Sequence, residues 1–292
     1  MTALADHAAR YLAVRRALGY KLSDTAPLIE SLIAHVEAAG AAHLSATLTL
    51  QWAAGAGSDG RYTRRLSVAR RFAAYLVSFD PATEIAPRGL RPDDRYGRPP
   101  HIYTDEEIGG LVAAARVLEP AGWASSVATA IGLAATCGLR PAEIYRLRVG
   151  DVDLADGRLA VRDSKGGRSR LLPLHATTVD ALGCHLGHRG PGVGVDDALF
   201  ATATGTPLTS AGFTPTFRRL AARVAIPPGR ARLGDLRHTF AVTTLVAWHR
   251  AGVDVNRRLP ALSAYLGHAR PASTYWYYSD SRVIPTSAPS RA

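Results

Sequence analysis

The sequence predicts a mainly α-helical protein with a small β-sheet (an α+β fold), built from two domains joined by a linker. Three observations lead to this prediction. Apolar residues recur at helical spacing over much of the first eighty residues. Prolines and arginines then crowd into residues 81–100. Beyond them helical spacing resumes, and it is interrupted by a two-residue alternation that is typical of a β-hairpin.

Length and composition indicate a globular protein that binds a polyanion. The 292 residues, 47% hydrophobic and 20% charged, are enough for two domains with cores. The net charge of +11 favours nucleic acid as a partner. A membrane surface would also attract positive charge, but the basic residues are scattered along the chain rather than gathered in one block.

Cysteine usage and the amino terminus predict where the protein acts. The two cysteines, Cys137 and Cys184, cannot form a disulfide framework, which favours a reducing cytosol. The chain does not begin like a signal peptide, and no apolar run is long enough to cross a bilayer. We therefore expect a cytoplasmic protein, nucleoid-associated in a prokaryote, or one that enters a nucleus by other means.

Residues 1–80 are predicted to form a helical domain. A helix over Tyr62–Phe79 is accompanied by five arginines: Arg61, Arg64, Arg65, Arg70 and Arg71. These could form an ordinary solvated face. Because no carboxylate lies between Arg61 and Arg71, we favour a surface that contacts DNA phosphates.

Residues 81–100 are predicted to be a basic, proline-rich linker. Proline stiffens such a segment in an extended form and prevents a helix. Its prolines are Pro81, Pro87, Pro92, Pro99 and Pro100, and its arginines are Arg88, Arg91, Arg95 and Arg98. The segment could help a clamp pass around a duplex, or it could be a plain spacer.

The second domain is predicted over residues 101–278, followed by a tail over residues 279–292. It opens with a capped helix start at Thr104, and a long helical stretch follows. That stretch ends at Gly138, and Pro141 suits the first turn of a new helix. Arg140 should therefore project from a rigid corner, with Glu143 three residues on to hold or orient it.

A β-hairpin is predicted next, with Lys165 at its tip. Leu159 and Val161 alternate with Arg158 and Arg162, residues 164–167 form the turn, and residues 170–174 return. A lysine in a turn is usually just solvated. Here only Lys21 and Lys165 are lysines, so 35 − 2 = 33 of the basic residues are arginines. Unlike arginine, lysine can give up a proton when its surroundings lower its pKa.

Two further clusters complete the pattern. Residues 234–241 read Gly-Asp-Leu-Arg-His-Thr-Phe-Ala and carry Arg237 and His238 into a helix. Residues 265–268 read Tyr-Leu-Gly-His, and Tyr277 lies nine residues after His268. Taken singly, these would be a surface or cap feature, a turn, and a tyrosine-rich core segment.

The order of these clusters resembles the tyrosine recombinase and phage integrase family. That family has an arginine after Thr-Gly-Leu, a hairpin lysine, His-x-x-Arg-His-Thr, Leu-Gly-His, and a tyrosine nine residues later. The resemblance covers residues 101 to 278 and is most similar to transposon-encoded integrases that end in Thr-Tyr-Trp-Tyr. It implies a helical core-binding domain over residues 1–80 and a tyrosine-recombinase catalytic domain over residues 101–278.

The resemblance also implies a reaction and a set of site residues. A tyrosine attacks the DNA phosphate, a 3′-phosphotyrosyl link forms, and a 5′-hydroxyl leaves and later attacks in return. The implied catalytic residues are Arg140, Lys165, Arg237, His268 and the nucleophile Tyr277, with Glu143 and His238 in support. Lys165 can act as the general acid, which an arginine cannot. No metal or cofactor is expected, since the covalent link stores the bond energy. Double-stranded DNA is the expected partner, with self-assembly on it from dimer to tetramer.

Two departures from the family pattern leave alternatives open. The first histidine of His-x-x-Arg falls at Gly234, which has no side chain, and only fifteen residues follow Tyr277. We expect these fifteen to lack the helix with which family members often pack on a neighbouring protomer. The protein could therefore be an active recombinase, a DNA-binding remnant of one, or an enzyme like a type IB topoisomerase that relaxes DNA without exchanging partners.

Overall fold

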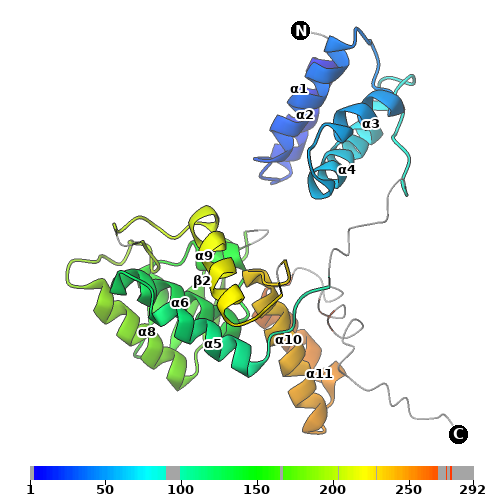
Figure 1. Cartoon of the computed structure of the whole chain (residues 1–292). Coiled ribbons are helices and arrows are strands. Elements are labelled where there is room, and N and C mark those ends of the chain that lie inside the picture. Colours follow the sequence, from blue (N-terminus) through cyan, green and yellow to red (C-terminus); the bar gives the residue numbers. More distant parts are fainter. Residues whose placement is uncertain are drawn as a thin grey trace, which may run out of the picture. The chain divides into compact units, whose positions relative to one another are not determined.

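The chain divides into two compact units, residues 1–99 and residues 100–292. The computed structural model in Figure 1 describes residues 3–89, 99–164, 167–202, 204–227 and 229–268, together with Thr274 and Tyr277. Lys165, Tyr275, Tyr278 and the tail over 279–292 lie outside the described residues, as do residues 90–98 of the predicted linker.

The first unit is helical. Its helices are α1 (Ala3–Ala17), α2 (Thr25–Ala38), α3 (Ala46–Ala54) and α4 (Asp59–Leu76). The apolar spacing of α2 puts Ile29, Leu32 and Val36 on one buried face, and this face packs with Phe72 and Leu76 of α4. Ser45 caps the first turn of α3, where its hydroxyl accepts from the Leu48 amide at 3.1 Å.

Residues 81–89 pack against the helices of the first unit. Ala86 is buried in its core, and the Glu84 amide donates to the Leu44 carbonyl at 2.8 Å. The Arg70 guanidinium donates to the carbonyls of Ala86 and Pro87. The first half of the predicted linker is therefore fastened to α4.

The second unit combines helices with a small sheet. Its helices are α5 (Asp105–Arg116), α6 (Ala121–Cys137), α7 (Pro141–Ile144), α8 (Ala176–Arg189), α9 (Ser210–Arg223), α10 (Leu233–Arg250) and α11 (Val255–Leu266), with a 3-10 turn η2 (Val149–Asp151). Its strands are β1 (Val152–Asp153), β2 (Arg158–Val161) and β3 (Arg170–Pro173). They pair antiparallel in the order β1-β2-β3, with Leu159 opposite Leu172.

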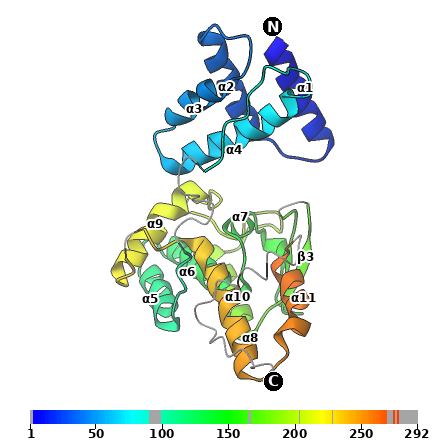
Figure 2. The same ribbon diagram turned by 90° about the vertical axis from the view of Figure 1, so that its right-hand side faces the viewer.

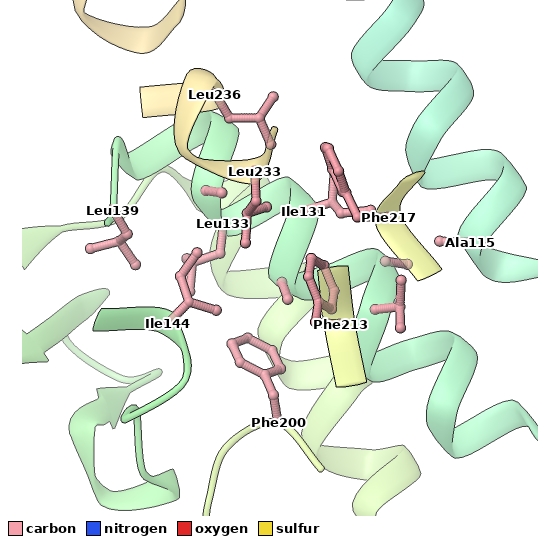
Figure 3. Packing of buried hydrophobic residues seen from close by; sticks show 14 of the residues in the cluster. Ala115, Ile131, Leu133, Leu139, Ile144, Phe200, Phe213, Phe217, Leu233 and Leu236 are labelled. Carbon is pink, nitrogen blue, oxygen red and sulfur yellow. The ribbon is translucent and has the colours of Figure 1, made fainter. Parts of the chain in front are cut away.

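Helix α6 lies at the centre of the second unit, with α5, α8 and α10 packed around it (Figure 2). Its buried residues are small or apolar and occur on several sides, as expected of a helix that is covered all round. Ile131 and Leu133 meet Phe213 and Phe217 of α9 and Leu236 of α10 in one cluster (Figure 3). Helix α10 is therefore held to the core close to Arg237.

The start of the second unit is also fastened to α10. The Tyr103 amide donates to the Thr239 hydroxyl at 3.0 Å, and the Tyr103 hydroxyl donates to the Arg232 carbonyl at 3.0 Å. The His101 amide donates to the Asp235 carboxylate at 3.3 Å. These bonds fix the first turn of α10, on which the Arg237 side chain depends.

The structure confirms the predicted fold class, a mainly helical chain with a small sheet. The single long helical stretch expected after Thr104 is in fact two helices, α5 and α6, because Pro120 cannot continue a helix. Within the described residues, no helix is long and apolar enough to cross a membrane.

Candidate active site

The corner between α6 and α7 places Arg140. Gly138 ends α6 in the left-handed region (φ 59°), where an added Cβ would lie 2.6 Å from Phe240 Cδ1. Only glycine meets both demands without strain or a shift of Phe240. Arg140 then caps α7, with Pro141 in its first turn. This is the rigid corner that the sequence predicts.

Glu143 pairs with the arginines beside this corner. Its side chain is only 1% exposed, and one oxygen accepts from Arg140 Nη1 at 2.8 Å. The Ser164 hydroxyl and the Arg140 amide also donate to the carboxylate. Burial alone would raise the pKa of Glu143, but the hydrogen bonds from Arg170, Ser164 and the Arg140 amide lower it to about 2. The carboxylate is therefore charged at any ordinary pH.

Arg170 of β3 is the second guanidinium on this carboxylate. Its Nη1 donates to Glu143 Oε1 at 3.0 Å and its Nη2 to Oε2 at 2.9 Å, a bidentate pair. Its Nε donates to the Tyr265 carbonyl at 2.8 Å. The Arg170 side chain thus joins β3, the returning strand of the predicted hairpin, to α7 and to the end of α11.

Arg237 projects from α10 into the same region. Its Nη1 donates to the Gly138 carbonyl at 2.8 Å and its Nη2 to the Leu266 carbonyl at 2.6 Å. Burial and the neighbouring charge of Arg140 lower the pKa of this guanidinium to about 10, so it stays protonated at neutral pH.

The guanidiniums of Arg140, Arg170 and Arg237 all donate hydrogen bonds to the carboxyl end of α11. Successive carbonyls of Tyr265, Leu266 and Gly267 accept from Arg170, Arg237 and Arg140, the last at 3.1 Å. The last carbonyls of a helix lack partners within it and form its negative end, so cations are favoured there. Gly267 turns the chain away in the left-handed region (φ 66°).

His268 follows directly, and its Nδ1 lies 2.7 Å from the Thr274 hydroxyl. Burial and then the charges of Arg237, Arg140 and Arg170 lower the pKa of His268 to about 4. The imidazole is therefore neutral at physiological pH, and the Thr274 hydroxyl donates to Nδ1 or accepts from it according to which ring nitrogen carries the hydrogen.

Tyr277 is buried beside these groups. It belongs to a cluster with Leu245 of α10 and Leu262 and Leu266 of α11. Its ring stacks on His268, with centroids 5.8 Å apart and planes at 15°, and meets His238 edge-on at 5.2 Å. Burial and the charge of Arg140 lower the pKa of Arg237, and the nearby Tyr277 phenol acts in the opposite direction.

Gly234 lies in the first turn of α10, one helical turn before Arg237. A Cβ added there would lie 3.7 Å from Pro141 Cγ, an ordinary contact, at a backbone conformation open to any L residue. The position would therefore accept a Cβ without strain.

The structure brings Arg140, Glu143, Arg237, His238, His268 and Tyr277 together, while Lys165 lies outside the described residues. Of the five arginines proposed for DNA, Arg61 and Arg64 are exposed on α4. The other three contact carbonyls of the first unit. Arg65 donates to Trp52 and its guanidinium lies over the Trp52 ring, Arg70 binds residues 86 and 87, and Arg71 donates to Ser67.

Sequence reasoning missed Ser164, Arg170 and Thr274. Arg170 could have been noticed from the alternation along β3. In this strand the charged Arg170 points inward and the apolar Leu171 points outward, which reverses the usual arrangement. The Arg170 side chain is 11% exposed, whereas Leu171 is 58% exposed. An arginine on the inward register of a strand indicates a buried partner of opposite charge. Ser164 and Thr274 left no such pattern.

The groups at this site fit a phosphodiester and a phenol nucleophile. Guanidinium forks match pairs of phosphate oxygens, and a tyrosine beside them can form a covalent intermediate. Among the described residues, no cluster of three or more His, Cys, Asp or Glu side chains could hold a metal ion.

Comparison with known proteins assigns the family. Residues 103–282 match the phage integrase family. The protein y4rE of Sinorhizobium fredii, provisionally named an integrase/recombinase, is 35% identical over 99% of this chain and 96% of its own length. Tyrosine recombinase XerD of Ralstonia nicotianae is 33% identical over 73% of this chain and 67% of its own. The chain belongs to the phage integrase family of tyrosine recombinases.

Solved structures agree on the fold. The Tn1549 transposon integrase, in complex with transposon right-end DNA, aligns over 95% of both chains with a TM-score of 0.69 at 17% identity. The XerH recombinase, bound to a palindromic difH substrate in a post-cleavage complex, covers 81% of this chain and 69% of its own with a TM-score of 0.61 at 18% identity.

Proposed function

We propose that the protein is a site-specific DNA recombinase that cuts and rejoins double-stranded DNA through Tyr277. The observation that carries the proposal is the meeting of Arg140, Arg237 and His268 around the end of α11, with the Tyr277 ring stacked on His268. Relatives named as recombinases and an integrase support it.

In the proposed reaction the Tyr277 phenol gives up its proton to water, its oxygen attacks phosphorus, and the bond to the 5′-oxygen breaks. The products are a 3′-phosphotyrosyl link and a 5′-hydroxyl, whose proton comes from Lys165. Arg140 and Arg237 stabilise the charge that develops on the nonbridging oxygens. His268 can donate to one of them only if its hydrogen sits on Nε2, which requires the Thr274 hydroxyl to donate to Nδ1.

Rejoining reverses these steps. A free 5′-hydroxyl attacks the phosphotyrosyl bond, Tyr277 leaves, and no external energy source is consumed. Exchange of partner strands requires several protomers on DNA, so we propose self-assembly from dimer to tetramer and a place in transposition on the bacterial nucleoid. The relatives from bacteria and the transposon integrase fold support this setting.

The absent side chain at Gly234 favours a second candidate, a DNA-binding remnant that cleaves slowly or not at all. The contact of 3.7 Å leaves room for the Cβ of a restored histidine there. Wild type and the Gly234→His variant therefore separate the two candidates.

The experiment uses duplexes selected from random-sequence DNA with the Tyr277→Phe variant. In a set of these duplexes a nick is stepped one nucleotide at a time, so that the short cleaved strand diffuses away and traps the covalent complex. An adduct from wild type on a denaturing gel supports the recombinase. An adduct from Gly234→His but not from wild type supports the remnant. If neither protein forms an adduct, the result contradicts both the proposed chemistry and the proposed function.

A further inference from the structure

We propose that Arg170 is a positioning residue for cleavage, which holds the phosphate-binding guanidinium of Arg140 through Glu143. The inference rests on the proposed function. It concerns a residue on β3, outside the clusters by which the site is recognised from sequence.

Arg170 pairs its charge with Glu143 through both Nη atoms, rather than with a phosphate. Each of its three guanidinium nitrogens already donates to the protein, two to Glu143 and one to the Tyr265 carbonyl, at 2.8 to 3.0 Å. The side chain is 11% exposed, against 23% for Arg140. Arg170 faces the protein, and Arg140 is the more open of the two.

Glu143 connects Arg170 to Arg140, so it can pass the restraint from one guanidinium to the other. Its carboxylate is 1% exposed and binds Arg140 through both the side chain at 2.8 Å and the backbone amide at 2.9 Å. A buried carboxylate keeps a fixed orientation only when its oxygens accept hydrogen bonds from groups other than the one that it positions. The bidentate fork of Arg170 supplies that hold. Without it, Glu143 could turn toward Arg140 and draw that guanidinium away from the phosphate.

Arg170 also fixes the second anchor of Arg140. Arg140 Nη2 donates to the Gly267 carbonyl, and Arg170 Nε holds the Tyr265 carbonyl two residues earlier. Two of the three anchors of the Arg140 side chain, the carboxylate and the helix end, are thus tied to Arg170, and the third is the Ser164 hydroxyl, which accepts from Arg140 Nη1 at 3.1 Å. A shift of about 1 Å in a group that stabilises a transition state can cost roughly 100-fold in rate.

Substrate chemistry tests which group Arg170 serves. Single-turnover cleavage is measured on a normal phosphodiester, on a methylphosphonate and on a 5′-bridging phosphorothiolate. The methylphosphonate lacks one charged oxygen, so it depends less on Arg140. The phosphorothiolate has a thiolate leaving group that needs no proton, so it does not depend on Lys165. Arg158→Gln on the adjacent strand is the matched control, since Arg158 is exposed and pairs only with Asp156 among the described residues.

We expect Arg170→Gln to slow phosphodiester cleavage by roughly 10- to 100-fold. The deficit should persist on the phosphorothiolate and shrink on the methylphosphonate, as for Arg140→Ala, while Arg158→Gln cleaves like wild type. Arg170→Lys should recover only part of the rate, because an ammonium cannot form the fork. Equal deficits on all three substrates, a deficit removed by the phosphorothiolate, or no deficit would each overturn the proposal.

A second readout keeps this inference separate from the proposed function. If wild type forms no adduct, the same series is run in the Gly234→His background. If neither protein cleaves, the proposed function has failed, and NMR of ¹⁵N-arginine protein tests Arg170 alone. The proposal expects the Arg140 guanidinium signal to lose its protection from exchange in Arg170→Gln but not in Arg158→Gln, and an unchanged signal would overturn it.

Discussion

At the scale of single residues, the site is a set of cations held in place by oxygens of the protein. Arg140 and Arg237 are each bonded to backbone carbonyls before any DNA is present. The electrostatic stabilisation of a phosphoryl transition state depends on such preorganised donors, which need not reorient during the reaction. The identity of each residue follows from this task, since only a guanidinium can bind a carbonyl and still present a fork to phosphate.

Thr274 should hold the His268 imidazole in a fixed orientation. Replacing it with valine removes the hydroxyl at 2.7 Å from Nδ1 while keeping the shape of the side chain. We expect Thr274→Val to slow cleavage by about 10-fold, the equivalent of about 1.4 kcal/mol, because the imidazole loses the hydrogen bond at Nδ1 that orients it. Thr274→Ser retains the hydroxyl and should cleave nearly as wild type does. Equal rates for wild type and Thr274→Val in single-turnover assays would contradict this role.

His268 should also make the protein sensitive to acid. Its pKa is about 4 in the folded state and 6.5 in a model peptide, so between these values the unfolded chain binds more protons. The free energy of unfolding should therefore be unaffected by this group above pH 6.5 and fall as the pH drops toward 4. Urea denaturation at a series of pH values measures the effect. The slope in this window should be flatter in His268→Gln, and an equal slope in both proteins would contradict the assignment.

At the scale of elements, the carboxyl end of α11 is the structural centre of the site. Sequence reasoning interprets Leu-Gly-His there as a turn, which is correct for Gly267 but overlooks the three carbonyls beside it. Helix α11 was not predicted, because Pro260 and the adjacent arginines obscure the spacing of its buried leucines. Side-chain types are visible in a sequence, whereas carbonyl groups, which every residue has, are not.

Gly267 provides a test of this element. A Cβ at Gly267 would lie 3.0 Å from Arg170 Nη1, whereas one at Gly252 would meet nothing within 4 Å, although both have φ near +66°. Alanine at either position should cost about 1–2 kcal/mol of stability through left-handed strain. Only Gly267→Ala should also slow cleavage, on the order of 10-fold or more, because it displaces Arg170. Thermal melts and single-turnover rates measured side by side check both, and similar rates for the two variants would count against the account.

At the scale of the whole molecule, the clusters that carry the chemistry are far apart in the chain. Arg140 and Gly267 are 127 residues apart, yet they share a hydrogen bond. The sequence predicts which residues belong to the site because their spacing is that of a family. It does not predict Ser164, Arg170 or Thr274, since their roles depend on which side chains the fold brings near them. Helices α8 and α9 also escaped prediction.

The net charge of +11 should govern DNA binding by the full chain. Arg61 and Arg64 are exposed on α4, so each can contact a phosphate and release a counterion. We expect the double variant Arg61→Ala/Arg64→Ala to reduce the slope of log affinity against log salt by about two. Arg148→Ala serves as the control, because Arg148 is exposed and pairs with Asp196. Titrations at several salt concentrations measure the slope, and an unchanged slope in the double variant would remove α4 from the DNA interface.

The central claim is that Tyr277, and no other residue, becomes joined to DNA. Its ring is stacked on His268 and meets His238 edge-on, and two neighbouring tyrosines, Tyr275 and Tyr278, share the same segment of sequence. The most direct measurement is mass spectrometry of peptides from the trapped covalent complex, formed by wild type or, if that is inert, by Gly234→His. The account predicts a nucleotide remnant on Tyr277 and no adduct from Tyr277→Phe. A remnant on Tyr275, Tyr278 or any other residue, or an adduct that survives Tyr277→Phe, would contradict it.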